Sequence, residues 1–147
     1  MTSRIVVGVD GSDESVASLR WAVDEARLRN ATVEVVHAWH YPYAVSTEIT
    51  GMAAGVLNRD DFEQAGRAQL DHAIEEAGAA TAGVPIVPVL VEGSAAGRLL
   101  EAAAGADLLV LGSRGRGGFV GLLLGSVSQQ CSHHAPCPIV VVPGTLP

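Results

Sequence analysis

Residues 112–128, GSRGRGGFVGLLLGSVS, combine glycines with arginines in a way that suits phosphate binding. Glycine lets backbone N–H groups approach a phosphate closely, and it adopts turns that other residues resist. Arg114 and Arg116 supply positive charge to offset a phosphate. Gly125 and Ser126 stand where a helix is expected to begin, and the N–H groups and dipole of a helix start attract anions. The stretch therefore predicts a phosphate-binding loop, with plain turn and cap glycines as the alternative.

Asp10 is a second residue with a candidate ligand role, because it follows a short apolar run from Ile5 to Val9. Ligands of open parallel sheets bind beyond the carboxyl ends of the strands, where the strand order reverses. If the run before Asp10 and the run that ends at Leu111 form neighbouring strands, Asp10 and the glycine-rich loop flank one crevice. Taken alone, Asp10 beside Gly11 is more simply explained as a turn residue.

Other clusters of reactive side chains favour structural roles. The segment from Cys131 to Cys137, CSHHAPC, holds four side chains that can bind metals, but their spacing is not that of a zinc site. We therefore predict no protein-held metal here and, in the cytosol, no disulfide between the two cysteines. His37 and His40 flank the end of a predicted strand and are expected to be structural. The chain lacks the G-x-S-x-G spacing of a nucleophile elbow, and we name no catalytic residue.

The overall composition narrows the classes of function. The chain has 147 residues, 48% of them hydrophobic, which predicts one domain over residues 1–147. All nine basic residues are arginines, which excludes a Walker A lysine and a lysine Schiff base. The net charge of −7 argues against a general binder of nucleic acids or anionic membranes. Without a signal-peptide pattern or a long apolar stretch, we expect a soluble, cytoplasmic protein.

Strand and helix patterns alternate along the chain. The predicted strands are Ile5–Val9, Ala31–Trp39, Val84–Val91, Asp107–Leu111 and Ile139–Val142. The predicted helices run from a Ser12 cap to about Arg29, then over Arg59–Ala80, Ala95–Ala104 and Gly125–His134. This order predicts an α/β fold: a doubly wound, mainly parallel five-stranded sheet with helices on both faces. Pro85 and Pro88 place the third strand at an edge, and the last strand is expected at an edge too.

The glycine spacing also resembles a known signature. Gly112-x2-Gly115-x9-Gly125-Ser126 is similar to G-x2-G-x9-G-[S/T], the nucleotide-binding signature of the universal stress protein family. The opening IVVGVDGSDES and the ending SHHAPCPIVVVP resemble the family's first and last strands. The resemblance covers nearly the whole chain and is weakest over residues 40–58. It implies a Rossmann-like fold of the adenine nucleotide alpha hydrolase-like type, in the ATP-binding subgroup of the family.

The resemblance implies a role for each matching residue. Asp10 would contact the base or the ribose, and Ala38 would offer its backbone to adenine. Val9 and Leu111 would lie beside the base. The residues implied to hold ribose and phosphates are Gly112, Arg114, Gly115, Gly125, Ser126, Val127 and Ser128. ATP is the implied ligand, with Mg²⁺ or Mn²⁺ carried on its phosphates.

Three functions remain open at this point. The first is an ATP-binding regulatory protein of stress adaptation, with slow hydrolysis at most. The second is a slow ATPase or phosphotransferase, and the third is a dimeric interaction module that binds cyclic AMP or no nucleotide. The resemblance further suggests a homodimer through the last strand, Ile139–Val142, whose exposed edge is a pairing surface. The sequence does not identify protein partners.

Overall fold

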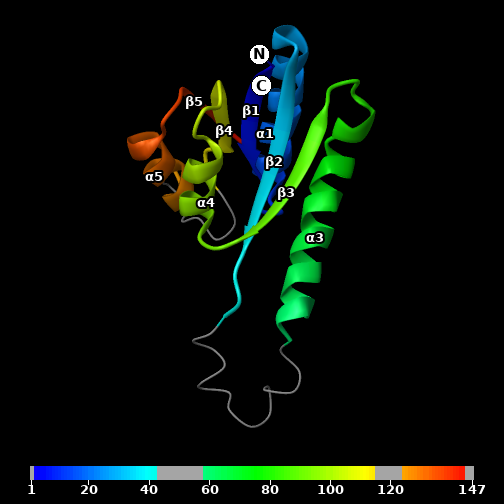
Figure 1. Ribbon diagram of the computed structural model, residues 1–147, viewed down its shortest axis with the longest axis vertical. Coiled ribbons are helices and arrows are strands. Elements are labelled where there is room, and N and C mark those ends of the chain that lie inside the picture. The colour runs from blue at the N-terminus through cyan, green and yellow to red at the C-terminus, as the bar shows by residue number, and fades with distance from the viewer. Residues whose placement is uncertain (1, 43–57, 115–123, 145–147) are drawn as a thin grey trace.

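The computed structural model describes residues 2–42, 58–114 and 124–144, which form a five-stranded sheet with helices on both sides (Figure 1). The strands are β1 (Ser3–Gly8), β2 (Ala31–Trp39), β3 (Ile86–Glu92), β4 (Leu108–Gly112) and β5 (Ile139–Val142). The helices are α1 (Asp13–Arg29), α3 (Arg59–Glu76), α4 (Ala95–Ala102) and α5 (Ser126–His134), and a short 3-10 turn, η1, covers Ala79–Thr81. The predicted alternation of strands and helices is confirmed.

The strand order β3-β2-β1-β4-β5 places the start of the chain at the centre of the sheet. All neighbouring strands are parallel. The chain moves outward from β1 to β3 and then crosses to the other side of β1, so the order reverses between β1 and β4. There Ile5 pairs with Leu108 and Val7 with Val110. The first and fourth predicted strands are therefore neighbours, and their carboxyl ends meet at the same edge, as the shared crevice requires.

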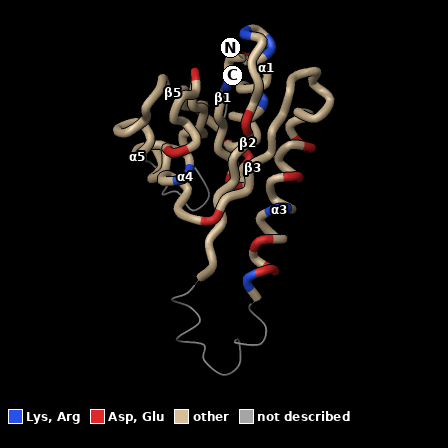
Figure 2. The backbone as a smooth tube through the Cα atoms, in the orientation of Figure 1, with Lys and Arg blue, Asp and Glu red and all other residues tan. Residues whose placement is uncertain are grey.

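Successive strand side chains pack on opposite faces of the sheet. On one face, α1 and α3 cover a cluster that includes Ile5, Val7 and Val35. On the other, α4 and α5 cover a cluster that includes Val6 and Val36. Covered on both faces, the strands are nearly continuous apolar runs, which is the pattern that predicted them. Acidic residues recur along α3 (Figure 2), and each of them is exposed. Within the described ranges, no helix has the length and apolar character needed to cross a bilayer.

The edge strands lie where the sequence predicted, but two helices end early. β3 and β5 form the two edges of the sheet. Helix α3 ends at Glu76 rather than near Ala80, because Gly78 takes a left-handed φ of 67° that breaks the helix before η1. Helix α4 ends at Ala102 rather than Ala104.

Arg4 explains the early end of α4. Its guanidinium donates hydrogen bonds to the carbonyl oxygens of Ala102 and Ala104, both at 2.8 Å, and to the Glu34 carboxylate at 3.0 Å. These bonds satisfy carbonyls that the helix end leaves without helical partners. Asp107 completes the junction, because its carboxylate accepts the Arg4 backbone N–H at 2.7 Å and the Ser3 hydroxyl at 3.1 Å. The amino ends of β1 and β4 are thus joined to the end of α4.

This junction makes stability depend on pH. The hydrogen bond from the Arg4 N–H, followed by that from Ser3, lowers the pKa of Asp107. A carboxylate with a lowered pKa stabilises the fold above its ordinary pKa, and that contribution is lost as pH falls through the lowered value. Asp107→Asn should therefore reduce the unfolding free energy at neutral pH, and its difference from wild type should shrink toward about pH 3.

Urea unfolding followed by circular dichroism at both pH values measures this difference. Asp71→Asn, a change at an exposed carboxylate of α3, serves as the control. An Asp107→Asn effect that stays constant across this pH range would contradict the role given to the junction.

Candidate functional site at the carboxyl ends of β1 and β4

Asp10 follows β1 and is held by the first turn of α1. Its Oδ1 accepts hydrogen bonds from the Ser12 N–H at 3.0 Å and the Ser12 hydroxyl at 2.5 Å. Its own N–H donates to the Ser15 hydroxyl at 3.3 Å. Ser12 in turn caps α1, because its hydroxyl oxygen accepts the Ser15 N–H. Asp10 therefore has the turn role considered from the sequence, and it stands, partly exposed, at the edge where the strand order reverses. Its contact with a base or ribose stays a prediction.

The backbone that leaves β4 runs beside the same turn of α1. The Ser113 N–H donates to the Val142 carbonyl at 2.9 Å, which extends the pairing of β4 with β5. The Arg114 N–H donates to the Glu14 carboxylate at 2.7 Å, and the Arg114 Nε lies 3.7 Å from the other oxygen of that carboxylate. The Arg114 side chain is still 42% exposed, so its charge is available at the rim of the site.

Helix α5 begins at Ser126, one residue after the predicted start at Gly125, which is its N-cap. Side-chain oxygens of Ser12, Asn58 and Ser94 cap α1, α3 and α4. Gly125 has no side chain that could accept a hydrogen bond. The first N–H groups of α5 therefore find no side-chain acceptor on their own cap residue. A helix start of this kind, with its dipole, favours an anion.

The other predicted residues of α5 differ in exposure. The Ser126 side chain is exposed at the helix start, whereas Val127 is partly buried against the core cluster beneath α4 and α5. Ser128 is 3% exposed, and its hydroxyl lies 3.0 Å from the Ser113 carbonyl oxygen and 3.1 Å from that of Gly125. Ser128 thus fixes the backbone around the helix start. A direct contact between Ser128 and ribose or phosphate stays a prediction.

Ser113 links the two ends of the glycine-rich loop. Its carbonyl oxygen accepts the Gly125 N–H at 2.6 Å as well as the Ser128 hydroxyl. Gly112 and Gly125 are therefore brought close together, as one phosphate site requires. Gly115 and Arg116 lie outside the described residues, so their part in the site stays a prediction. Sequence analysis did not find the linking role of Ser113, because a serine in a loop is compatible with many hydrogen-bond patterns.

On the opposite side of Asp10, β1 and β2 end side by side. The Val9 N–H donates to the Val36 carbonyl at 2.9 Å, and the Val9 carbonyl accepts a hydrogen bond from Nδ1 of His37 at 2.8 Å. Because a carbonyl only accepts, this bond places a proton on Nδ1. The buried His37 therefore has the structural role expected of it. Ala38, the predicted backbone partner of adenine, follows it directly and is partly exposed.

The side chains of Val9 and Leu111 lie within the core. They are 5% and 4% exposed, and Val9 directly follows β1 whereas Leu111 is the last residue but one of β4. The start of α3 is anchored at the same edge of the sheet. Arg59 stacks 5.2 Å from the centre of the Trp39 ring and pairs with Glu92. Of the segment at residues 40–58, positions 43–57 lie outside the described residues.

The histidine and cysteine side chains of α5 and its surroundings offer little to a ligand. In the parts of the chain that the structure describes, no three histidine, cysteine or acidic side chains gather as a metal site. Cys131 lies on the inner side of α5 and is completely buried, and this burial raises the pKa of its thiol. A raised pKa leaves less thiolate, the form that binds metals and reacts.

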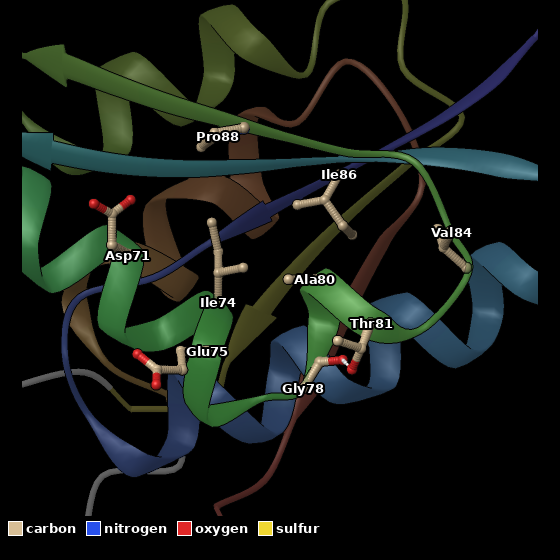
Figure 3. A pocket seen from close by; sticks show the side chains of 9 residues that line it. All are labelled: Asp71, Ile74, Glu75, Gly78, Ala80, Thr81, Val84, Ile86 and Pro88. Carbon is tan, nitrogen blue, oxygen red and sulfur yellow. Dashed lines mark hydrogen bonds between the residues drawn. The ribbon is translucent and has the colours of Figure 1, made fainter.

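A groove of about 510 Å³ lies at the other end of the sheet (Figure 3). The end of α3, η1 and the start of β3 form it, and Ile74, Val84 and Ile86 give it an apolar lining. Asp71 and Glu75 are the charged residues among those that line it, so it offers no positive charge to a phosphate. The features predicted to bind phosphate lie instead at the carboxyl ends of β1 and β4.

Comparison with known proteins identifies the family of this chain. Residues 1–143 match the model of the universal stress protein family. A universal stress protein of Mycolicibacterium smegmatis is 36% identical over 146 residues, which are 95% of this chain and 48% of the relative. One of Bacillus subtilis is 30% identical over 149 residues, covering 97% of this chain and 99% of the relative. The chain spans about half the length of the mycobacterial relatives that it matches.

Solved structures show the same fold. A universal stress protein in complex with cAMP superposes with a TM-score of 0.68 at 28% identity, over 97% of this chain and 98% of the other. One from Archaeoglobus fulgidus in complex with dAMP gives 0.69 at 23% identity, over 95% and 97%. Together with the match over residues 1–143, this likeness shows that the chain belongs to the universal stress protein family.

Proposed function

We propose that this protein binds an adenine nucleotide, with ATP as its ligand, and acts as a nucleotide-dependent regulator in stress adaptation in the cytoplasm. The observation that supports this most strongly is that Asp10 and the start of α5 both lie at the carboxyl ends of β1 and β4, where the strand order reverses. That start has no side-chain cap and lies close to a partly exposed arginine, Arg114. This is the place and the chemistry that nucleotide phosphates require in an open parallel sheet.

The proposed nucleotide lies across the ends of β2, β1 and β4. Adenine meets the backbone of Ala38 beside Val9 and Leu111, and Asp10 contacts the base or the ribose. The groups proposed to hold ribose and phosphates are those of Gly112, Arg114, Gly115, Gly125, Ser126, Val127 and Ser128. A Mg²⁺ or Mn²⁺ ion fits as a companion of the phosphates, because such ions need few protein ligands there.

The protein is proposed to bind ATP with slow hydrolysis at most. Phosphoryl transfer to water needs a group that orients or activates the water. Among the described residues beside the proposed site, Asp10 and Glu14 carry carboxylates, and both accept hydrogen bonds from nearby backbone and hydroxyl groups. Both are thus committed to holding the backbone rather than presented to a water molecule.

Cyclic AMP is the second candidate ligand. The solved relative at 28% identity was captured with cAMP, which shares adenine, ribose and a phosphate with ATP. The proposed base and ribose contacts are common to both nucleotides. ATP and cAMP differ in the contacts that their phosphates would make with the start of α5 and with Arg114. Affinities for ATP, AMP and cAMP measured side by side therefore distinguish the two candidates.

Arg114→Gln tests the phosphate end of the site. Removing a charge that partners a phosphate should lower ATP affinity by about tenfold or more, with a smaller effect on cAMP, which carries less charge. Isothermal titration calorimetry at low and at physiological salt measures both ligands. Arg67→Gln, at an exposed position on α3, is the matched control and should bind as wild type does. Equal ATP affinity in the two variants would contradict the proposed placement of the phosphates.

We also propose a homodimer that forms through β5. This strand is an open edge of the sheet, and Ile139, Val140 and Val141 are partly exposed. A second copy of the chain would cover these side chains.

Val141→Asp should convert the dimer to monomer, because a charge buried in an apolar contact is costly. Light scattering after size exclusion measures the mass. Val87→Asp is the control, because Val87 lies on the opposite edge strand and is 44% exposed. A Val141→Asp protein with the mass of the wild-type dimer would rule out this interface.

A further inference from the structure

Glu14 joins the first turn of α1 to the residues that follow β4 at the proposed nucleotide site. It lies in the first turn of α1, and its Oε2 accepts the Arg114 N–H at 2.7 Å and is 3.4 Å from the Ser113 hydroxyl. Its Oε1 lies 3.7 Å from the Arg114 Nε. One carboxylate thus holds the backbone, a hydroxyl and the guanidinium of the two residues that follow β4.

The same two residues connect Glu14 to the start of α5. The Ser113 carbonyl accepts the Gly125 N–H at 2.6 Å and the Ser128 hydroxyl at 3.0 Å. The Ser113 N–H is bonded to the Val142 carbonyl at 2.9 Å. A continuous chain of hydrogen bonds therefore runs from Glu14 through Ser113 to the helix start that is proposed to bind phosphate.

Close packing restricts the Glu14 side chain to this position. A Cβ atom at Gly112 would lie 3.3 Å from the Glu14 Cβ, and one at Gly144 would collide with the Glu14 Cγ and carboxylate. Two glycines from β4 and from the segment after β5 thus leave a narrow slot, and the Glu14 side chain, 20% exposed, fills it. A side chain confined in this way keeps its hydrogen bonds at little further entropic cost.

Asp13 shows that this role goes beyond favourable charge at a helix start. Asp13 and Glu14 are both acidic residues of the first turn of α1, where either favours the helix dipole. Asp13 is exposed, whereas Glu14 turns toward the backbone that follows β4. The dipole accounts for an acidic residue in this turn, but it does not account for the contacts of Glu14.

We infer that Glu14 is a positioning residue of the nucleotide site, which holds Ser113 and Arg114 so that the start of α5 is ready to bind phosphate. The inference rests on the proposed function for its ligand. The hydrogen bonds of Glu14 themselves do not depend on a bound ligand. Removing the acceptor leaves the loop end free to move, and a binding site that is not held in place loses affinity.

The test compares Glu14→Ala, Glu14→Gln and Asp13→Ala in two measurements on the intact protein. Glutamine keeps an oxygen that accepts the Arg114 N–H, whereas alanine removes it. Asp13→Ala removes a charge of the same turn without touching the loop. The first measurement is amide hydrogen exchange at Arg114 and Gly125, followed by NMR without nucleotide. The second is the affinity for ATP by calorimetry, with thermal unfolding as a check that every variant is folded.

Glu14→Ala should speed exchange at Arg114 and Gly125 by about tenfold and weaken ATP binding by a similar factor. Glu14→Gln should recover most of both losses, and Asp13→Ala should match the wild type. Wild-type exchange rates in Glu14→Ala, or equal losses in the alanine and glutamine variants, would overturn the positioning role. Faster exchange in Glu14→Ala, together with a wild type that binds no ATP, would uphold that role and overturn the proposed function instead.

Discussion

The pairing of β1 with β4 is the constraint on which the rest of the site depends. These strands lie far apart in the sequence, yet Ile5 pairs with Leu108 and Val7 pairs with Val110. Parallel pairing brings their carboxyl ends to one edge, and the reversal of strand order between them separates the helices that follow, with α1 on one face and α5 on the other. Two helix starts therefore meet at the same place from opposite faces of the sheet.

The two helix starts are used differently. The start of α1 is satisfied internally, because Ser12 caps it and Asp10 bonds to Ser12. The start of α5 has only a glycine as its cap residue. Glu14 and Ser113 connect the two starts, so the satisfied one supports the one that remains able to bind an anion. This division suits a protein that holds a nucleotide.

Most of the fold could be predicted from the sequence, because each element has a local cause that the residues display. The apolar run of residues 139–142 predicted β5, the Ser12 cap predicted the start of α1, and Pro85 and Pro88 predicted the edge position of β3, all correctly. The end of α4 could not be predicted, because it depends on Arg4, which is close to it only in the folded chain. The end of α3 was misplaced because alanines on both sides of Gly78 continue a helical pattern.

Prediction of the site was uneven for the same reason. The glycine spacing predicted Gly112 and Gly125, and the end of a strand pattern predicted Asp10. These predictions were possible because a tight turn, or a backbone that approaches a ligand closely, restricts the type of residue at that position. Glu14 and Ser113 escaped notice because their roles arise from contacts between segments about 100 residues apart. Nothing in the local sequence distinguishes Glu14 from Asp13, and the structure separates them by where each carboxylate points.

An NMR titration of the labelled protein with ATP tests the central claim most directly, because it shows where the nucleotide binds without changing a residue. Binding across the reversal of strand order predicts saturable amide shifts at Asp10, Ala38, Arg114 and Ser126, at the carboxyl ends of the strands. Ile74 and Val84, which line the groove at the other end, should keep their shifts. Saturable shifts confined to that groove, or none at millimolar ATP, would contradict the account.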